Sequence, residues 1–235
     1  MNLRRIKNNL LQADVSDCVK KICSLLKLRP DQKVLLDLGT NDGSKTLQFA
    51  GTIDVQNTLI IGADINNKLL LKAKGRGMLT LRCDFETNLP FKQETVDVLV
   101  TNQVIEHLSN TDLFIENISR ILKRNGYAII ATENISYWAN IVVMILGYQA
   151  FSQNISDYFH IGNPFSGLAG EEFPEDMAGH THRRIFSIRG LPSLLEKYNF
   201  KIEAVLGAGF APFPPWFSIF DKIHARFIVI KARKI

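Results

Sequence analysis

The feature that most limits the fold of this chain is a regular alternation of short apolar runs with segments of helical periodicity. Several of these runs are continuously apolar, which is typical of strands buried on both faces of a sheet. Strands of that kind joined by helices form a parallel sheet that helices cover on both sides. We therefore predict a doubly wound α/β fold with strands at residues 34–38, 58–65, 78–83, 96–102, 127–132, 200–208 and 225–234. The predicted helices lie at residues 14–28, from 44 onward, and at 66–76, 111–126 and 187–198.

The length of 235 residues suits a single domain, 1–235, because one hydrophobic core can extend to roughly 250 residues. A composition of 46% hydrophobic and 22% charged residues excludes a disordered or fibrous chain. A helical lead-in, residues 1–30, precedes the sheet, and an insertion of about fifty residues, 133–185, follows the fifth strand. Because so long a connection in a compact domain is usually functional, we expect the insertion to form the acceptor side or a lid.

The sequence has no pattern typical of export or of a membrane span. Three cysteines lack the CxxC spacing of a zinc site, and their odd number argues against a disulfide framework, so we expect a cytoplasmic protein. The first residues lack the continuous apolar run of a signal peptide, and the longest apolar run, near 141–146, is far shorter than the ~20 residues that span a bilayer. The net charge of +5 is scattered, which indicates a solvated surface.

Small and polar residues gather directly after the first four predicted strands. In an open α/β sheet, ligands bind outside the carboxyl ends of the strands, so these loops should meet at one site. The first loop, Asp37–Gly43, has small residues where a backbone must approach a ligand at the start of a helix. Asp64 ends the second strand, where a carboxylate accepts ribose hydroxyls or caps a helix. Asn66 and Asn67 can serve as that cap instead.

The third and fourth loops add a carboxylate, an aromatic ring and a group of polar side chains. Asp84 and Phe85 follow the third strand, and this pair suits the amine and the face of an adenine. The alternative is a capping aspartate followed by a core phenylalanine. The fourth strand continues into a segment that places several polar side chains where the core meets a cleft: Asn102, Gln103, Glu106 and His107.

The order and spacing of these loops resemble the class I S-adenosylmethionine-dependent methyltransferase family, over about the first 130 residues and best from Val34 to Leu108. The D-x-G-x-G-x-G turn and the E-H-L sequence are similar to its small-molecule and glycan-type group. The resemblance implies a Rossmann-like, seven-stranded, mostly parallel sheet with an antiparallel last strand, and S-adenosyl-L-methionine as cofactor. It implies cofactor contacts by Asp37, Gly39, Thr40, Asn41, Gly43, Asp64, Ile65, Asp84, Phe85, Asn102 and Gln103.

One position departs from that family pattern. The middle glycine of the turn is Asn41, the non-glycine type that best tolerates a left-handed backbone, so the turn can survive with altered cofactor binding. A dinucleotide-binding turn needs a third glycine three residues after the second. The chain has Gly39 and Gly43 and lacks that third glycine, which disfavours a nicotinamide cofactor.

Methyl transfer is an in-line displacement that requires alignment of the acceptor and, for a hydroxyl or amine, removal of its proton. His107 is the first candidate for the base because it follows the fourth strand, although a structural role is the alternative. His182, within the segment 180–184, is the second candidate, with a surface loop histidine as the alternative. The His180-x-His182 pair has no nearby carboxylate pair or thiol in the sequence, so we assign no metal site.

Aromatic and apolar segments occupy the acceptor-binding half of the predicted site, where the family resemblance is poor. Seven aromatic residues of the insertion form either a lid or a small core: Tyr137, Trp138, Tyr148, Phe151, Tyr158, Phe159 and Phe165. Two Trp-bearing segments, 137–148 and 211–220, suit either burial or peripheral contact with a membrane or partner.

We expect methyl transfer to oxygen, nitrogen or carbon of a small molecule, with a sugar or lipid-linked glycan as acceptor; the preference for a glycan rests on the resemblance. RNA methylation is the alternative suggested by the basic pI of 9.1, but the sequence TNQV replaces the motif expected after the fourth strand, and nucleic acid is disfavoured. A binding or scaffold protein that has lost turnover is a third hypothesis, based on Asn41.

Overall fold

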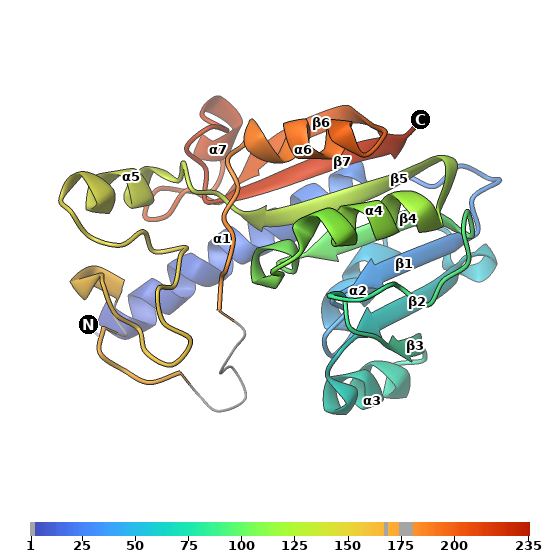
Figure 1. Cartoon of the computed structure of the whole chain (residues 1–235), viewed down its shortest axis with the longest axis horizontal. Coiled ribbons are helices and arrows are strands. Elements are labelled where there is room, and N and C mark those ends of the chain that lie inside the picture. Colours follow the sequence, from blue (N-terminus) through green and yellow to red (C-terminus); the bar gives the residue numbers. More distant parts are fainter. Residues whose placement is uncertain (1–2, 167–168, 174–180) are drawn as a thin grey trace.

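The computed structural model describes residues 3–166, 169–173 and 181–235 and contains one seven-stranded sheet flanked by helices (Figure 1). The strands are β1 (Val34–Leu38), β2 (Leu59–Asp64), β3 (Leu79–Arg82), β4 (Val96–Asn102), β5 (Leu122–Glu133), β6 (Phe200–Ala208) and β7 (Phe227–Lys234). The α-helices are α1 (Leu3–Leu25), α2 (Ser44–Ala50), α3 (Asn67–Gly75), α4 (Thr111–Ile121), α5 (Trp138–Ile145), α6 (Gly190–Lys197) and α7 (Phe217–Phe220). Short 3-10 turns are η1 (Val55–Asn57), η2 (Ile105–His107) and η3 (Pro164–Ser166).

The strand order is β3-β2-β1-β4-β5-β7-β6. Strand β1 pairs in parallel with β2 on one side and β4 on the other, whereas β7 lies antiparallel between β5 and β6. The predicted mostly parallel sheet is therefore confirmed, and the antiparallel strand is the last one in the chain. Because the chain winds outward in opposite directions from β1 and β4, the crevice for a ligand opens at the carboxyl ends of these two strands.

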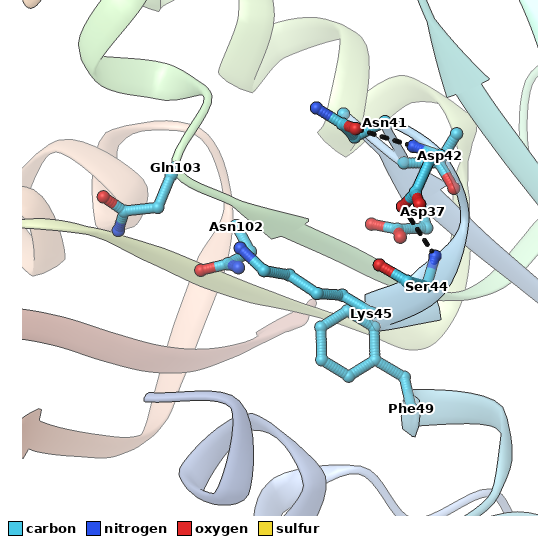
Figure 2. Close-up of a pocket in the computed structure, with 10 residues that line it drawn as sticks. Asp37, Asn41, Asp42, Ser44, Lys45, Phe49, Asn102 and Gln103 are labelled. Carbon is cyan, nitrogen blue, oxygen red and sulfur yellow. Dashed lines mark hydrogen bonds between the residues drawn. The ribbon is translucent and has the colours of Figure 1, made fainter. Parts of the chain in front are cut away.

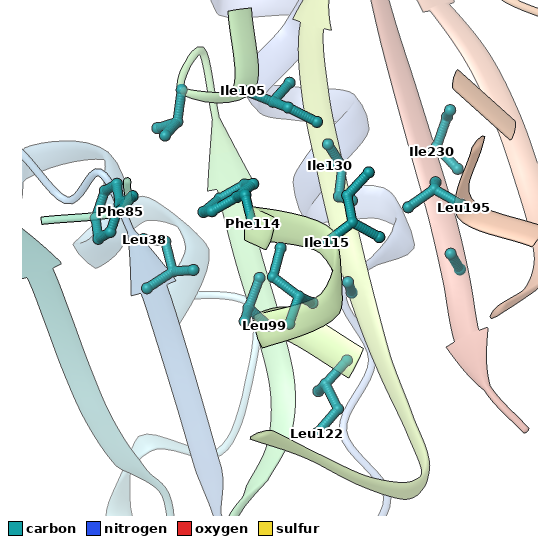
Figure 3. Packing of buried hydrophobic residues seen from close by; sticks show 14 of the residues in the cluster. Leu38, Phe85, Leu99, Ile105, Phe114, Ile115, Leu122, Ile130, Leu195 and Ile230 are labelled. Carbon is teal, nitrogen blue, oxygen red and sulfur yellow. The ribbon is translucent and has the colours of Figure 1, made fainter. Parts of the chain in front are cut away.

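Two hydrophobic clusters lie on opposite faces of the sheet. One joins the sheet to α4 and α6, with Phe114, Ile115 and Leu195 fully buried (Figure 3). The other joins the sheet to α1 and α2, with Ile22 and Phe49 buried. The alternation of side chains along each strand divides the core in this way, since neighbouring residues of one strand point to opposite faces.

The helical lead-in is longer than expected, from Leu3 to Leu25, and it is tied to the far end of the chain. The buried carboxylate of Asp14 accepts the backbone N–H groups of Phe210 (2.9 Å) and Ala211 (3.3 Å). Asp17 accepts the N–H of Gly209 at 2.8 Å. These bonds hold α1 against the carboxyl end of β6, so the first helix helps to build the edge of the sheet where the crevice opens.

The predicted helix 111–126 ends earlier, at Ile121, and the chain continues directly as β5. The buried Leu122 pairs with Val96, and after an irregular turn with Asn125 at φ 61° the register resumes at Tyr127. Pairing and burial of Leu122 in the sheet therefore override the helical periodicity of this segment. In the described part of the chain, no helix has the length and apolar character needed to cross a bilayer.

The insertion contains α5 and η3, which the sequence analysis did not predict, and its residues 167–168 and 174–180 lie outside the described part. Its aromatic residues do not form the small core considered above. Tyr137 is buried, but five others are exposed: Tyr148, Phe151, Tyr158, Phe159 and Phe165.

Candidate active site

The loop after β1 forms the predicted tight turn. Gly39, Asn41 and Gly43 all have positive φ angles, of 87°, 53° and 81°. Asn41 thus adopts the left-handed conformation of the glycine it replaces, and its backbone N–H donates to Asp64 Oδ2 at 2.8 Å. Its side chain is exposed, so the substitution leaves the turn intact.

Gly39 has no room for a side chain. A Cβ added there would lie 2.3 Å from Val104 Cγ2 in the loop after β4. We expect Gly39→Ala to lower the free energy of unfolding by about 2–4 kcal/mol, because a left-handed alanine and overpacking each cost on the order of 1–2 kcal/mol. Urea denaturation measures this change. The matched control is Gly75→Ala at the end of α3, where a Cβ meets nothing within 4 Å and stability should change by less than about 1 kcal/mol. Equal effects of the two substitutions would contradict the steric argument.

Asp37 is a buried carboxylate at the carboxyl end of β1. The hydroxyl of Thr46, from α2, donates to its Oδ2, and Thr46 in turn lies 2.6 Å from the hydroxyl of Thr40. Burial raises the pKa of Asp37 to about 7, while the Thr46 hydrogen bond and the charge of Lys45 act in the opposite direction. A group poised between its charged and neutral forms near neutral pH is typical of a functional site.

A cavity of about 290 Å³ lies over this turn, near the lower end of the range of roughly 300–1,000 Å³ typical of small-molecule sites. Figure 2 shows most of its lining and the Lys45 side chain extending from the first turn of α2 toward Asn102. Six lining residues were predicted from sequence: Asp37, Gly39, Thr40, Asn41, Asn102 and Gln103. Four further lining residues were not predicted, although their position in the turn and the helix that follows it was a usable signal: Asp42, Ser44, Lys45 and Phe49.

Asp64 lies at the end of β2, as predicted, but its carboxylate is already engaged. One oxygen accepts the N–H of Asn41 and the other accepts the N–H of Asn66 at 2.9 Å. Asn66 is the N-cap of α3, which confirms that Asp64 is not needed for that role. Asp64 therefore links the first two loops, and each of its oxygens keeps acceptor capacity for a ribose hydroxyl.

The structure contradicts the prediction that the Phe85 ring of the third loop faces a cofactor. The Phe85 ring is buried and packs against Phe114, with 5.9 Å between centroids, so it belongs to the core and does not face the cavity (Figure 3). Asp84 accepts the N–H of Glu86, the local bond expected of a capping aspartate. Phe85 is therefore the core phenylalanine of the alternative interpretation, whereas a cofactor contact of the exposed Asp84 stays a prediction. Gly43, Asp64 and Ile65 also lie outside the cavity lining.

A second cavity, of about 190 Å³, adjoins the first through three shared lining residues: Lys45, Asn102 and Gln103. Leu11, Val15 and Cys18 of α1 form one wall, and Phe227 and Glu133 complete it. The lead-in helix therefore contributes to a cavity as well as to packing. Gln103 lies at φ 59°, and among the described residues its buried Nε2 has no hydrogen-bond partner.

The two catalytic candidates meet in space although 75 positions separate them. The rings of His107, at the end of η2, and His182 lie 4.8 Å apart in an edge-to-face arrangement. His182 lies near Glu133 of the second cavity, whose pKa burial raises against the opposing charges of Arg226 and His182. His180, the other member of the His180-x-His182 pair, lies outside the described residues.

The fold and these loops define a class I methyltransferase architecture, and comparison with known proteins agrees. Residues 36–130 match the methyltransferase domain family. The chain is 28% identical over 134 residues to the mitochondrial ubiquinone biosynthesis O-methyltransferase of Rattus norvegicus, covering 56% of this chain and 32% of that protein. It is 28% identical over 113 residues to the tRNA (carboxymethyluridine(34)-5-O)-methyltransferase of Arabidopsis thaliana, covering 47% and 26%. The chain thus spans about a third or less of these two relatives.

Among solved structures, an S-adenosylmethionine-dependent methyltransferase from Thermotoga maritima superposes with a TM-score of 0.60 at 16% identity, over 99% of this chain and 96% of that chain. This likeness shows a shared fold. The sequence match over residues 36–130, from β1 to β5, together with this fold supports a class I S-adenosylmethionine-dependent methyltransferase with S-adenosylmethionine as cofactor.

Proposed function

We propose that this chain transfers the methyl group of S-adenosylmethionine to a small molecule with an apolar portion, and that a lipid-linked sugar or glycan is its acceptor. The observation that carries the proposal is the pair of adjoining cavities at the carboxyl ends of β1 and β4. The first is mostly polar and lies over the glycine turn, and the second has an apolar wall from α1 and β7. A cofactor and an acceptor placed in them would meet at the shared residues Asn102 and Gln103.

The residues of the first cavity fit the cofactor. Asp37 offers a carboxylate for the ammonium group of the methionine portion, and Lys45 offers a cation for its carboxylate. Asp64 lies outside the lining but accepts the N–H of the lining residue Asn41, and with the backbone of the turn it offers acceptors for a ribose. Bound there, S-adenosylmethionine supplies a methyl group on a positively charged sulfur that an electron pair of the acceptor can displace. The unpartnered Nε2 of Gln103 supports the view that a ligand completes this site, since a buried polar group without a partner costs roughly 1–3 kcal/mol.

We propose that His107 and His182 lie beside the bound acceptor and promote the loss of its proton. Both side chains are only partly buried, and the charge of His182 acts on Glu133, which lines the second cavity. Exposed apolar side chains on α5 and α7, such as Ile145 and Phe220, support a lipid-linked acceptor and peripheral contact with a membrane.

We expect His107→Ala to lower turnover about 100-fold or more while leaving the affinity for S-adenosylmethionine within about threefold, because general acid–base groups contribute roughly 10²–10⁴ to rate. Calorimetry measures the affinity. Transfer of labelled methyl to aqueous and membrane-lipid extract fractions measures turnover and identifies the acceptor class.

The matched control is His224→Ala, a half-buried histidine paired with Asp221 outside both cavities, which should retain turnover. Three outcomes count against the proposal. Absence of binding heat at high S-adenosylmethionine concentration favours a scaffold protein, label only in RNA favours the tRNA-type alternative, and full turnover of His107→Ala removes the proposed role of this residue.

A further inference from the structure

Three side chains at the acceptor end form a cluster that the proposed function uses only in part. Glu106 and His107 belong to η2, and His182 lies near the end of the insertion 133–185. One potential ligand atom from each of the three lies within 4.8 Å of the other two. No sequence spacing could indicate this set, because 75 residues separate the two histidines. It is also distinct from the His180-x-His182 pair considered from sequence.

The backbone orients both imidazole rings in the same way. His182 Nδ1 lies 2.8 Å from the carbonyl oxygen of Ser152, and His107 Nδ1 lies 3.4 Å from the carbonyl oxygen of Thr181. A carbonyl oxygen only accepts, so in the neutral rings each Nδ1 carries the proton and each Nε2 carries the lone pair. Histidines that bind metals are held in this manner, with one ring N–H donated to a carbonyl or carboxylate and the other nitrogen on the metal.

Glu106 provides the third potential metal-binding atom. Its environment also indicates that a ligand binds here. Its side chain is fully buried, and its Oε2 accepts a hydrogen bond from the hydroxyl of Thr132 at 2.8 Å. Its Oε1 is buried and has no hydrogen-bond partner among the described residues. A buried acceptor without a partner is costly, whereas a ligating carboxylate is typically hydrogen-bonded through its other oxygen.

We propose that Glu106, His107 and His182 bind one Zn²⁺ ion. Two imidazole nitrogens and one carboxylate oxygen are a donor set that zinc uses in catalytic sites, where three protein ligands leave a position open for water or substrate. Ligands at about 2.1 Å around tetrahedral zinc lie about 3.4 Å apart. The three atoms must therefore draw together by at most about 1.4 Å from their present separations, which side-chain rotations can supply.

This inference rests on the proposed function in one respect, because an acceptor hydroxyl would take the open position. Zinc lowers the pKa of a bound hydroxyl, so the proton leaves to solvent water and the electron pair stays on the oxygen. That oxygen forms a bond to the methyl carbon while the bond from the methyl carbon to sulfur breaks and its electron pair goes to sulfur. Protons, electrons and the methyl group are then balanced without a further reactant, and the imidazoles promote proton loss as ligands of the ion in place of direct general-base catalysis.

The test uses the full chain stripped of metal with a chelator and then titrated with Zn²⁺ by calorimetry and with Co²⁺ as a spectroscopic substitute. We expect saturable one-to-one binding, with visible Co²⁺ absorption of a low-coordinate site. Glu106→Gln and His182→Ala should each weaken binding about 100-fold or more, since even outer partners of metal ligands contribute 10–100-fold. His224→Ala, outside the cluster, should bind as the wild-type chain does.

Circular dichroism establishes whether each variant is folded. If the substitution of the buried Glu106 prevents folding, His182→Ala alone tests the site. Absence of one-to-one binding, or equal affinity in the wild-type chain and both cluster variants, overturns the zinc site. Binding of S-adenosylmethionine to the metal-free chain is measured in parallel. Retained cofactor binding without zinc binding refutes only the metal inference, whereas zinc binding without cofactor binding refutes only the proposed function.

Discussion

Asp37→Asn is expected to weaken S-adenosylmethionine binding by about 10- to 100-fold at pH 8, because a hydrogen bond between charged groups contributes about 1.5–3 kcal/mol. In the empty chain, burial raises the pKa of Asp37 to about 7 from an ordinary 3.8. A bound ammonium group requires the charged carboxylate, so binding releases the proton that Asp37 holds below pH 7. The affinity of the wild-type chain should therefore fall by up to about tenfold for each pH unit below 7 and be level above it.

The same substitution should stabilise the empty protein at alkaline pH. The folded chain binds the Asp37 proton more tightly than the unfolded chain does, so this group makes the free energy of unfolding fall as pH rises from about 4 to about 7. Above pH 7 the penalty is constant, and Asp37→Asn removes it. We therefore expect Asp37→Asn to bind the cofactor poorly. Its free energy of unfolding should exceed that of the wild type by more at pH 8 than at pH 5.

Calorimetry and urea denaturation from pH 5 to pH 9 measure both effects. Asp97→Asn is the control for binding, since this buried carboxylate lies at the opposite end of the sheet, where it accepts the N–H groups of Lys33 and Val34. Its cofactor affinity should stay within about twofold of the wild type. An unchanged pH profile of binding in Asp37→Asn would show that Asp37 does not face the ammonium group.

Asp64→Ala should abolish measurable S-adenosylmethionine binding, with a loss of at least about 100-fold. The carboxylate has two tasks: it accepts the N–H of Asn41 and so holds the turn, and it is the proposed partner of the ribose hydroxyls. Removing it leaves the Asn41 N–H without its acceptor, and each lost charged hydrogen bond costs about 1.5–3 kcal/mol. Asp64→Asn, which keeps one oxygen for Asn41, should bind with intermediate affinity.

Calorimetry at pH 8 compares these variants with Asp54→Ala. Asp54 is an exposed aspartate that also accepts a backbone N–H, that of Gln56, but it precedes β2 and lies away from both cavities. Its affinity should equal that of the wild type. If Asp64→Ala binds normally, the assignment of the ribose site at the end of β2 is wrong.

The sequence predicted the elements that depend on local patterns. The buried strand 96–102 lies where expected, and Asn41 adopts the left-handed backbone that its residue type permits. The misplaced boundary at Leu122 has a different origin. There the helical periodicity continues, but pairing of Leu122 with Val96 across the sheet is decided by a partner 26 positions away.

The roles of side chains at the site also divide into those that local patterns predict and those that long-range packing decides. Types and spacing placed Asp37 and Asp64 at strand ends, where the topology of an α/β sheet requires the crevice. Whether a ring faces the ligand or the core depends on what packs against it, and Phe114 decided that for Phe85. The sequence by itself therefore determined the order of the strands, the helices that alternate with them and the glycine-type turn, because these follow from short-range periodicity and backbone preference. Only the tertiary structure decided that α1 lines a cavity and that Glu106, His107 and His182 meet, because such contacts join residues whose separation along the chain carries no signal.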